Sequence, residues 1–214
     1  MAKLFNDDVR KQITDILTQA KNPVQIVLFT KEGVCPTCAE TKQLLEEVCD
    51  TTDKLSLISK NIETDSALAE TYGITLTPSF VMLDHEGNYK GVMFNGIPAG
   101  HEINSLISAL LEMSGLNIHY QEQIIKRIKS IDKPVNIKVF VTLSCPHCPG
   151  AVQNAHRLAM LNSNIVGEMI EAQTFHELSQ KHNVSGVPKI VINDTHELVG
   201  NQPIEAFLET IESL

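Results

Sequence analysis

The sequence predicts an α/β protein made of two tandem units, each with a mixed central sheet flanked by helices. The motif Cys35-Pro36-Thr37-Cys38 returns 110 positions later as Cys145-Pro146-His147-Cys148, and each first cysteine precedes a proline, Pro78 or Pro188, by 43 positions. In both halves, short apolar runs alternate with segments of helical periodicity. Such alternation is typical of strands connected through helices.

Residues 1–115 supply the elements of one unit. Apolar residues recur at helical spacing over residues 4–20, and Asn22-Pro23 ends this helix. The apolar run Val24–Thr30 is typical of a buried strand, and Pro36 suits the opening of a helix that reaches about Asp50. The pattern then predicts a strand at 55–62, a helix at 65–72, hairpin strands at 79–83 and 89–94, and a helix at 101–113.

Residues 116–214 repeat this order after a joint at 114–117, which is too short for a flexible linker. A helix is predicted at 120–130, and Pro134 precedes a strand at 135–142. Pro146 suits the opening of a helix that reaches about Leu161. The remaining predicted elements are a strand at 165–171, a helix at 175–182, hairpin strands at 189–192 and 197–199, and a final helix at 204–214.

Composition narrows the class of protein. The 214 residues suit two small units, and 43% apolar residues are enough for two ordinary cores. A net charge of −9 argues against nucleic acid or an anionic membrane as the main partner. There is no apolar run long enough to span a membrane, and the N-terminus lacks the apolar core of a signal peptide, so we expect a cytoplasmic protein. In that reducing compartment, paired cysteines are more often catalytic or metal-bound than structural.

Besides the first motif, five stretches resemble one family: Asn22-Pro23-Val24, Lys31-Glu32-Gly33-Val34-Cys35, Gly96-Ile97-Pro98-Ala99-Gly100-His101-Glu102, Ser144-Cys145-Pro146-His147-Cys148-Pro149 and Gly186-Val187-Pro188-Lys189-Ile190-Val191-Ile192. Along nearly its whole length the chain is similar to the protein disulfide oxidoreductases, also called glutaredoxin-like proteins. These join two thioredoxin-fold units in one cytoplasmic polypeptide. The resemblance implies disulfide exchange with protein substrates and no cofactor other than the redox-active disulfides Cys35-Cys38 and Cys145-Cys148.

The two cysteines of each motif are predicted to have different roles. Exchange needs a thiolate, and a helix N-terminus stabilises one through its unpaired N–H groups and its dipole. Cys35 and Cys145 are expected at such termini and are therefore predicted to be the nucleophiles. Cys38 and Cys148, three positions on, are expected to be less exposed and to resolve the mixed disulfide.

The resemblance also gives the two downstream prolines a role. It implies that Pro78 and Pro188 are cis-prolines facing the dithiols, and that Thr77 and Val187 offer their backbones to an extended substrate peptide. The alternative is an ordinary trans proline at a strand entry, because only about 5–6% of X–Pro bonds in folded proteins are cis.

The dipeptides between the cysteines, Pro36-Thr37 and Pro146-His147, are expected to modulate the two sites. His147 can donate a hydrogen bond or carry positive charge, whereas Thr37 offers only a hydroxyl. DsbA, whose family motif is also Cys-Pro-His-Cys, has a potential near −120 mV against about −270 mV for thioredoxin. The second site is therefore predicted to be the more oxidising one, unless surrounding residues cancel the effect of the dipeptide.

Acids that could relay protons are hard to identify from the sequence. The strands that lead to the two motifs contain no Asp or Glu. Glu63 and Glu171 are candidates, with Glu168 as a third, although each also fits a solvated charge at a strand end. The fifth cysteine, Cys49, ends an apolar helical pattern and is expected to be a small buried side chain.

Two other functions remain open. Two Cys-X-X-Cys pairs could bind zinc, although structural zinc sites usually bring their pairs within about 15–20 residues, and here 106 residues separate them. The two-unit N-terminal domain of the alkyl hydroperoxide reductase flavoprotein resembles the second half, notably Cys145-Pro146-His147-Cys148-Pro149 and Ala151-Val152-Gln153. That resemblance suggests an electron-transfer module for a peroxide-reducing system, with a peroxiredoxin among its partners.

The sequence leaves the electron donor and the direction of flux open. It has no Gly-rich dinucleotide fingerprint. Electrons are therefore expected from a thioredoxin reductase-like donor or from small thiols. Reductase, oxidase and isomerase activities use the same residues and differ in potential and partner.

Overall fold

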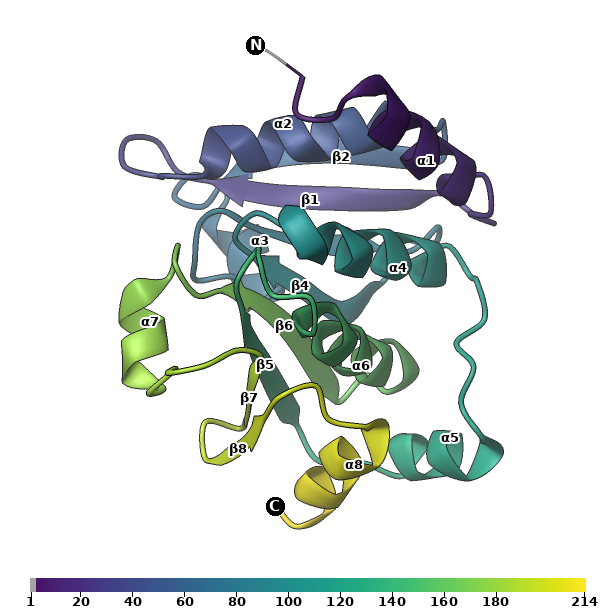
Figure 1. The fold of residues 1–214 in the computed structure, drawn as a ribbon, viewed down its shortest axis with the longest axis vertical. Coiled ribbons are helices and arrows are strands. Elements are labelled where there is room, and N and C mark those ends of the chain that lie inside the picture. The colour runs from purple at the N-terminus through teal and green to yellow at the C-terminus, as the bar shows by residue number, and fades with distance from the viewer. Residues whose placement is uncertain (1–2) are drawn as a thin grey trace.

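The strands of the protein form one eight-stranded sheet in the order β2-β1-β3-β4-β6-β5-β7-β8 (Figure 1). The computed structural model describes residues 3–214. The strands are β1 Val24–Thr30, β2 Leu55–Asn61, β3 Ser79–Leu83, β4 Tyr89–Asn95, β5 Val135–Val141, β6 Ile165–Glu171, β7 Lys189–Ile192 and β8 His196–Val199. The helices are α1 Asp7–Leu17, α2 Cys38–Cys49, α3 Ser66–Thr71, the 3₁₀ turn η1 Gly100–Glu102, α4 Ile103–Met113, α5 Glu122–Lys129, α6 Cys148–Leu161, α7 His176–Lys181 and α8 Ile204–Glu212.

The same strand pairing occurs in both halves, which confirms the predicted mixed sheets. In the first half, β1 pairs with β2 in parallel and with β3 in antiparallel, and β3 pairs with β4 in antiparallel. In the second half, β5 pairs with β6 in parallel and with β7 in antiparallel, and β7 pairs with β8 in antiparallel. The segment between α4 and α5 crosses from one half to the other. The domain limits 1–115 and 116–214 remain a prediction.

A parallel pairing of β4 with β6 joins the two halves, and the sequence analysis did not foresee it. The register runs from Val92 opposite Gly167 to Asn95 opposite Ile170. Gly167 allows α6 to pack closely on this joint, because a Cβ there would lie 2.5 Å from the carbonyl oxygen of Ala155. Since α6 contacts both β4 and β6, a helix of the second half covers strands of both halves.

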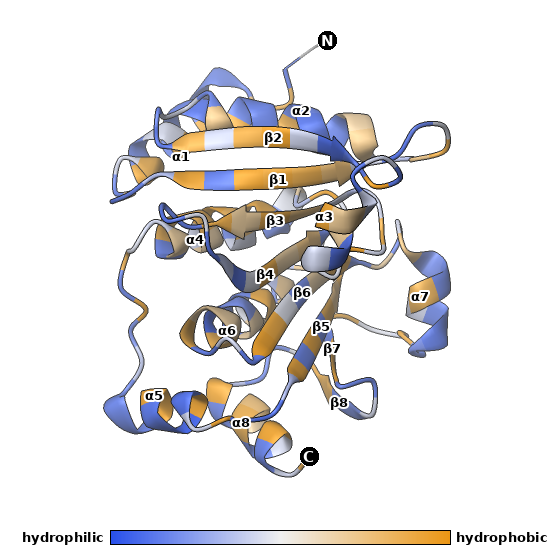
Figure 2. Ribbon diagram, turned by 180° about the vertical axis from the view of Figure 1, so that it is seen from behind, coloured by the Kyte–Doolittle hydropathy of each residue, from blue (hydrophilic) through white to orange (hydrophobic). Residues whose placement is uncertain are grey.

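The core lies on both faces of this sheet. The main apolar cluster extends through both halves under α1, α2, α4, α6 and α8, and two smaller clusters lie under α3 and α7 on the opposite face. The central strands are largely hydrophobic and the solvent-facing sides of the helices are hydrophilic (Figure 2). Within residues 3–214, none of the helices has the length and apolarity that a bilayer crossing requires.

One edge of the sheet collects both motifs and both prolines, and we call it the motif edge. The carboxyl end of β1 pairs with the start of β3 through Phe29 and Ser79, just as β5 pairs with β7 through Phe140 and Lys189. The carboxyl ends of β4 and β6 lie at the same edge, because Asn95 pairs with Ser79 in β3 and with Ile170 in β6. Each cysteine motif therefore follows a strand that ends beside the point where its proline loop enters the next strand.

His156 makes the joint sensitive to acid. This buried α6 side chain places Nε2 3.2 Å from the carbonyl oxygen of Met93 in β4, and its ring lies 4.7 Å from that of Phe94. Burial lowers the pKa of His156 from 6.5 to about 4. Below pH 6.5 the unfolded chain therefore binds a proton that the folded chain does not, and stability falls as the pH drops towards 4.

We expect this histidine to cost about 2–3 kcal/mol of unfolding free energy between pH 7 and pH 4.5. Urea unfolding at the two pH values should show this loss in the wild type and a correspondingly smaller loss in His156→Phe. His85→Ala, which removes an exposed histidine of the β3–β4 turn, is the control and should keep the wild-type pH dependence. Equal losses in wild type and His156→Phe would show that His156 is not the responsible group.

Candidate functional site

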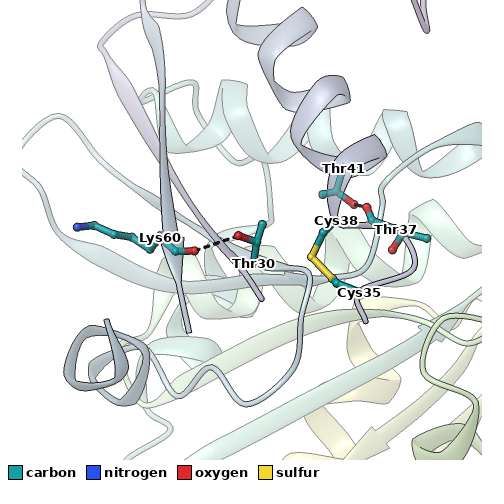
Figure 3. The surroundings of a disulfide bond; sticks show 6 residues. All are labelled: Thr30, Cys35, Thr37, Cys38, Thr41 and Lys60. Atoms are coloured by element: carbon teal, nitrogen blue, oxygen red, sulfur yellow. Dashed lines mark hydrogen bonds between the residues drawn. A yellow bond between two sulfur atoms is a disulfide. The ribbon is translucent and has the colours of Figure 1, made fainter. Parts of the chain in front are cut away.

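The first motif lies in the connection between β1 and α2. Cys35 and Cys38 form a disulfide with their Cα atoms 5.5 Å apart, and the Cys38 N–H donates to the Cys35 carbonyl at 3.4 Å (Figure 3). The helix begins at Cys38, so the prediction that Pro36 opens it is wrong by two residues. The residues from Cys35 to Cys38 form a turn, and regular helical bonds start only after it. Both cysteines are half-buried.

The second motif has the same arrangement between β5 and α6. Cys145 and Cys148 form a disulfide with a Cα separation of 5.6 Å, and the Cys145 N–H donates to the Thr142 carbonyl at 3.1 Å. Here too the helix begins at the second cysteine, two residues after Pro146. Cys145 is 9% exposed and Cys148 is fully buried, so the predicted difference in exposure is present at this site.

Both predicted cis-prolines are confirmed. The Thr77-Pro78 and Val187-Pro188 peptide bonds are cis. At the second site the Sγ of Cys145 lies 3.9 Å from the carbonyl oxygen of Val187, which brings dithiol and proline loop into contact. The two loops are anchored alike, because the Pro78 carbonyl accepts a backbone N–H at 2.9 Å and the Pro188 carbonyl accepts one at 2.8 Å.

The dipeptides give the two sites different surroundings. The Thr37 carbonyl accepts both the backbone N–H and the hydroxyl of Thr41, at 2.9 Å and 2.6 Å, which fixes the first turn of α2 (Figure 3). Among the described residues, the buried Thr37 hydroxyl has no hydrogen-bond partner. His147 occupies the matching N-cap position of α6 and is exposed. An ionisable side chain therefore flanks only the second disulfide at this position.

His147→Tyr is expected to lower the reduction potential of the second dithiol by a few tens of millivolts. For a two-electron couple, ~30 mV corresponds to roughly 1.4 kcal/mol, which sets the scale of this shift. We expect the imidazole to stabilise the thiolate of the reduced form, so that its loss favours the disulfide. Equilibration with glutathione buffers would measure this in a Cys35→Ser/Cys38→Ser background. The first dithiol, measured in a Cys145→Ser/Cys148→Ser background, should keep its potential. An unchanged or higher potential at the second dithiol would mean that His147 does not act on the sulfur.

The acids proposed from the sequence have structural partners of their own. Glu63 is exposed and pairs with Lys31 at 3.4 Å. Glu171 is buried, and its carboxylate accepts both the N–H and the hydroxyl of Thr174, so the view that it is a solvated charge is wrong. Glu168 is half-buried and accepts hydrogen bonds from two asparagine side chains. These contacts give all three acids structural roles.

Glu102 is a buried acid that the sequence analysis missed. It is fully buried in η1, one carboxylate oxygen accepts the Ser105 hydroxyl, and the other has no partner among the described residues. Burial raises the pKa of Glu102 to about 7. Its turn lies against the loop that leads to Cys145, because the His101 N–H donates to the Leu143 carbonyl at 2.9 Å. The available sequence signal was the family-like stretch that ends at this residue.

The zinc-binding alternative receives no support from the geometry. Within residues 3–214, no three histidine, cysteine or acidic side chains are grouped as metal ligands would be. The motif cysteines instead pair within each motif. Cys49 is half-buried and unpaired, and burial raises its pKa to about 12, so it is a poor nucleophile at neutral pH.

Comparison with known proteins decides the fold family. Residues 135–213 match the family model described as a thioredoxin domain. The N-terminal domain of the alkylhydroperoxide reductase AhpF from Enterococcus faecalis superposes with a TM-score of 0.91 and 29% identity, over 97% of this chain and 99% of that one. The chain is a two-unit thioredoxin-fold protein. A protein disulfide oxidoreductase from Aeropyrum pernix also matches this thioredoxin-fold chain, with a TM-score of 0.90 and 29% identity over 97% of this chain and 92% of that one. The resemblance stated from the sequence is thereby confirmed.

Curated relatives of this thioredoxin-fold chain are longer than the chain itself. The AhpF protein of the Staphylococcus aureus alkyl hydroperoxide reductase is 31% identical over 210 residues, which cover 98% of this chain and 38% of the relative. The Staphylococcus epidermidis protein of the same name is 29% identical over the same extent. The chain thus spans about two fifths of the length of these curated relatives.

Proposed function

We propose that this protein is a thiol–disulfide oxidoreductase that exchanges disulfides with protein substrates through its two dithiols. The observation that carries the proposal is the duplicated juxtaposition of a disulfide-forming Cys-Pro-X-Cys motif with a cis-proline loop at one sheet edge. At the second site this juxtaposition is measured directly, as the 3.9 Å between the Cys145 sulfur and the Val187 carbonyl. A carbonyl beside a reactive sulfur can receive a backbone N–H of an extended substrate.

In the proposed reaction, the thiolate of Cys35 or Cys145 attacks one sulfur of a substrate disulfide. A mixed disulfide forms, and the other substrate sulfur leaves as a thiolate that takes up a proton. Cys38 or Cys148 then attacks the protein sulfur of that mixed disulfide, which releases the second substrate thiol and leaves the protein disulfide. Burial raises the pKa of Glu102 to about 7, so this carboxyl, whose turn contacts the loop that leads to Cys145, exchanges protons near neutral pH.

The proposed reaction needs no cofactor beyond the two disulfides. Each turnover as a reductase leaves the protein oxidised, so two electrons must return from a thioredoxin reductase-like donor or from small thiols. The reducing cytoplasm is the setting that fits paired cysteines that cycle between thiol and disulfide.

A second candidate function is electron transfer to a peroxide-reducing system. It is favoured by the match to AhpF of alkylhydroperoxide reductase, whose N-terminal domain has the same two-unit fold. The partner would then be a peroxiredoxin disulfide, which the same exchange chemistry reduces. Peroxide-dependent oxidation of the reduced protein that requires an added peroxiredoxin would favour this candidate over a general reductase.

An insulin-reduction assay with dithiothreitol as electron source tests the proposed function. We expect the wild-type protein to accelerate precipitation of the insulin B chain well beyond the rate with dithiothreitol alone. The variant with serine at Cys35, Cys38, Cys145 and Cys148 is the control and should give only the uncatalysed rate. A wild-type protein no faster than this control would contradict the proposal.

A further inference from the structure

A pocket of about 740 Å³ opens at the motif edge, and both halves of the chain line it. Leu76 comes from the loop before β3, and the other walls come from the segment 174–181, which follows β6 and includes α7. The strand order places β3, β4 and β6 between the two motif-bearing strands. The pocket therefore lies between the two dithiols along this edge, with α7 on the side of the sheet opposite α6 (Figure 1).

The pocket adjoins the proline loop of the first site, through Leu76, rather than that of the second. Leu76 directly precedes Thr77, whose backbone we propose receives a substrate at the first site. Among the described residues that line the pocket, none belongs to the loop that contains Val187. An extended substrate peptide that pairs with Thr77 would therefore need to run on by only about one residue, or ~3.3 Å, to place a side chain at this pocket.

The joint between the halves holds the second half against the first proline loop. The Gly96 N–H donates to the Pro78 carbonyl at 2.9 Å. A Cβ at position 96 would lie 2.7 Å from the Cβ of Glu171 and 3.5 Å from the ring of Phe175. The Glu171 carboxylate in turn fixes the next turn by accepting the N–H and hydroxyl of Thr174. These contacts fix the position of the segment that forms the pocket wall relative to the first proline loop.

The lining predicts the chemistry of the occupant. The lining includes three apolar side chains, Leu76, Phe175 and Leu178, together with polar and charged residues of the segment 174–181. Val34, which directly precedes Cys35, is an apolar side chain that is 90% exposed. Apolar walls of this kind bind apolar side chains, because burial removes apolar surface from water on both partners.

We propose that this pocket binds an apolar side chain of a protein substrate whose disulfide exchanges at the first dithiol. The second half would then act as a specificity element for the active site of the first half. This inference rests on the proposed function, and it adds that the two dithiols differ in substrate preference because the pocket serves one of them.

The test uses a Cys145→Ser/Cys148→Ser background, in which only the first dithiol can turn over, with dithiothreitol as electron source. Two synthetic peptides with an intramolecular disulfide serve as substrates, one with leucine and the other with serine on both sides of the reactive cysteine. We expect the leucine peptide to have the lower KM, by on the order of tenfold. Leu178→Gln should remove this preference, whereas the matched control Gln180→Ala, an exposed α7 residue outside the pocket, should keep it.

Further arms separate the possible outcomes. Leu76→Gln tests the pocket from the other half, in case Leu178→Gln disturbs α7. Glutathione disulfide should be reduced equally by all these variants, since it is too small to need the pocket. Absence of a leucine preference at the first dithiol would overturn the inference, and so would a preference that survives both glutamine substitutions. The inference would also fail if the second dithiol, in a Cys35→Ser/Cys38→Ser background, showed the same leucine preference and lost it equally on these substitutions. A wild-type protein that reduces neither glutathione disulfide nor either peptide would contradict the proposed function itself.

Discussion

Cys145→Ser is expected to abolish most of the insulin-reducing activity, whereas Cys35→Ser should leave a clear fraction of it. The two sites are built alike, but an exposed imidazole flanks only the second disulfide at the variable position of the motif. A cation or hydrogen-bond donor beside a sulfur increases its thiolate fraction, and the thiolate is the attacking species. The second site should therefore provide most of the turnover, and initial rates of insulin reduction at pH 7 measure each contribution.

Cys49→Ser is the matched control, because Cys49 is unpaired and lies at the far end of α2 from the first motif. It should retain wild-type rates. Equal losses from Cys35→Ser and Cys145→Ser would contradict the predicted asymmetry. They would indicate either two equal sites or a relay that needs both.

Cys148→Ser should trap substrates on Cys145 as mixed disulfides. The wild-type resolving step is intramolecular, and well-placed intramolecular groups act at effective concentrations of about 10⁵ M or more. Millimolar external thiol cannot replace such a group, so we expect turnover at the second site to fall by at least ~100-fold. Non-reducing electrophoresis followed by peptide mapping would identify the trapped adducts.

The Cys145→Ser/Cys148→Ser double variant is the control for this trapping and should lose the adducts. Adducts that map to Cys38 or Cys49 in the Cys148→Ser protein would show that the nucleophile has been misassigned. The fully buried position of Cys148 argues for the present assignment, because a protein substrate reaches Cys145 more easily.

The regular elements could be predicted because each one is encoded locally. The apolar runs of β1, β3, β6 and β7 have the predicted limits, since turn and breaker residues bound each run. The positions of the dithiols opposite the prolines could also be predicted, because a duplicated motif and its spacing repeat one known geometry. The starts of α2 and α6 were less accurate, because hydrogen-bonded turns, Cys35–Cys38 at the first motif and Thr142–Cys145 before the second, leave no distinct pattern in the sequence.

The features that could not be predicted depend on contacts between distant segments. The pairing of Asn95 with Ile170 joins strands whose periodicity carries no information about their partner. Glu102 looks like an ordinary charge in a helix, and only the packing of η1 makes it a buried acid with a raised pKa. The pocket beside Leu76 likewise exists only because α7 of the other half is held next to it.

The joined sheet also has a consequence for cutting the chain in two. Two separate four-stranded sheets would leave four strands with unpaired backbone groups along one side, whereas the joined sheet leaves two, β2 and β8. Expressing either half alone would uncover β4 or β6, and the stretch Val92 to Asn95 or Gly167 to Ile170 would lose its neighbour. Such bare strands recruit other chains, so each half alone is expected to self-associate through the strand that the cut uncovers.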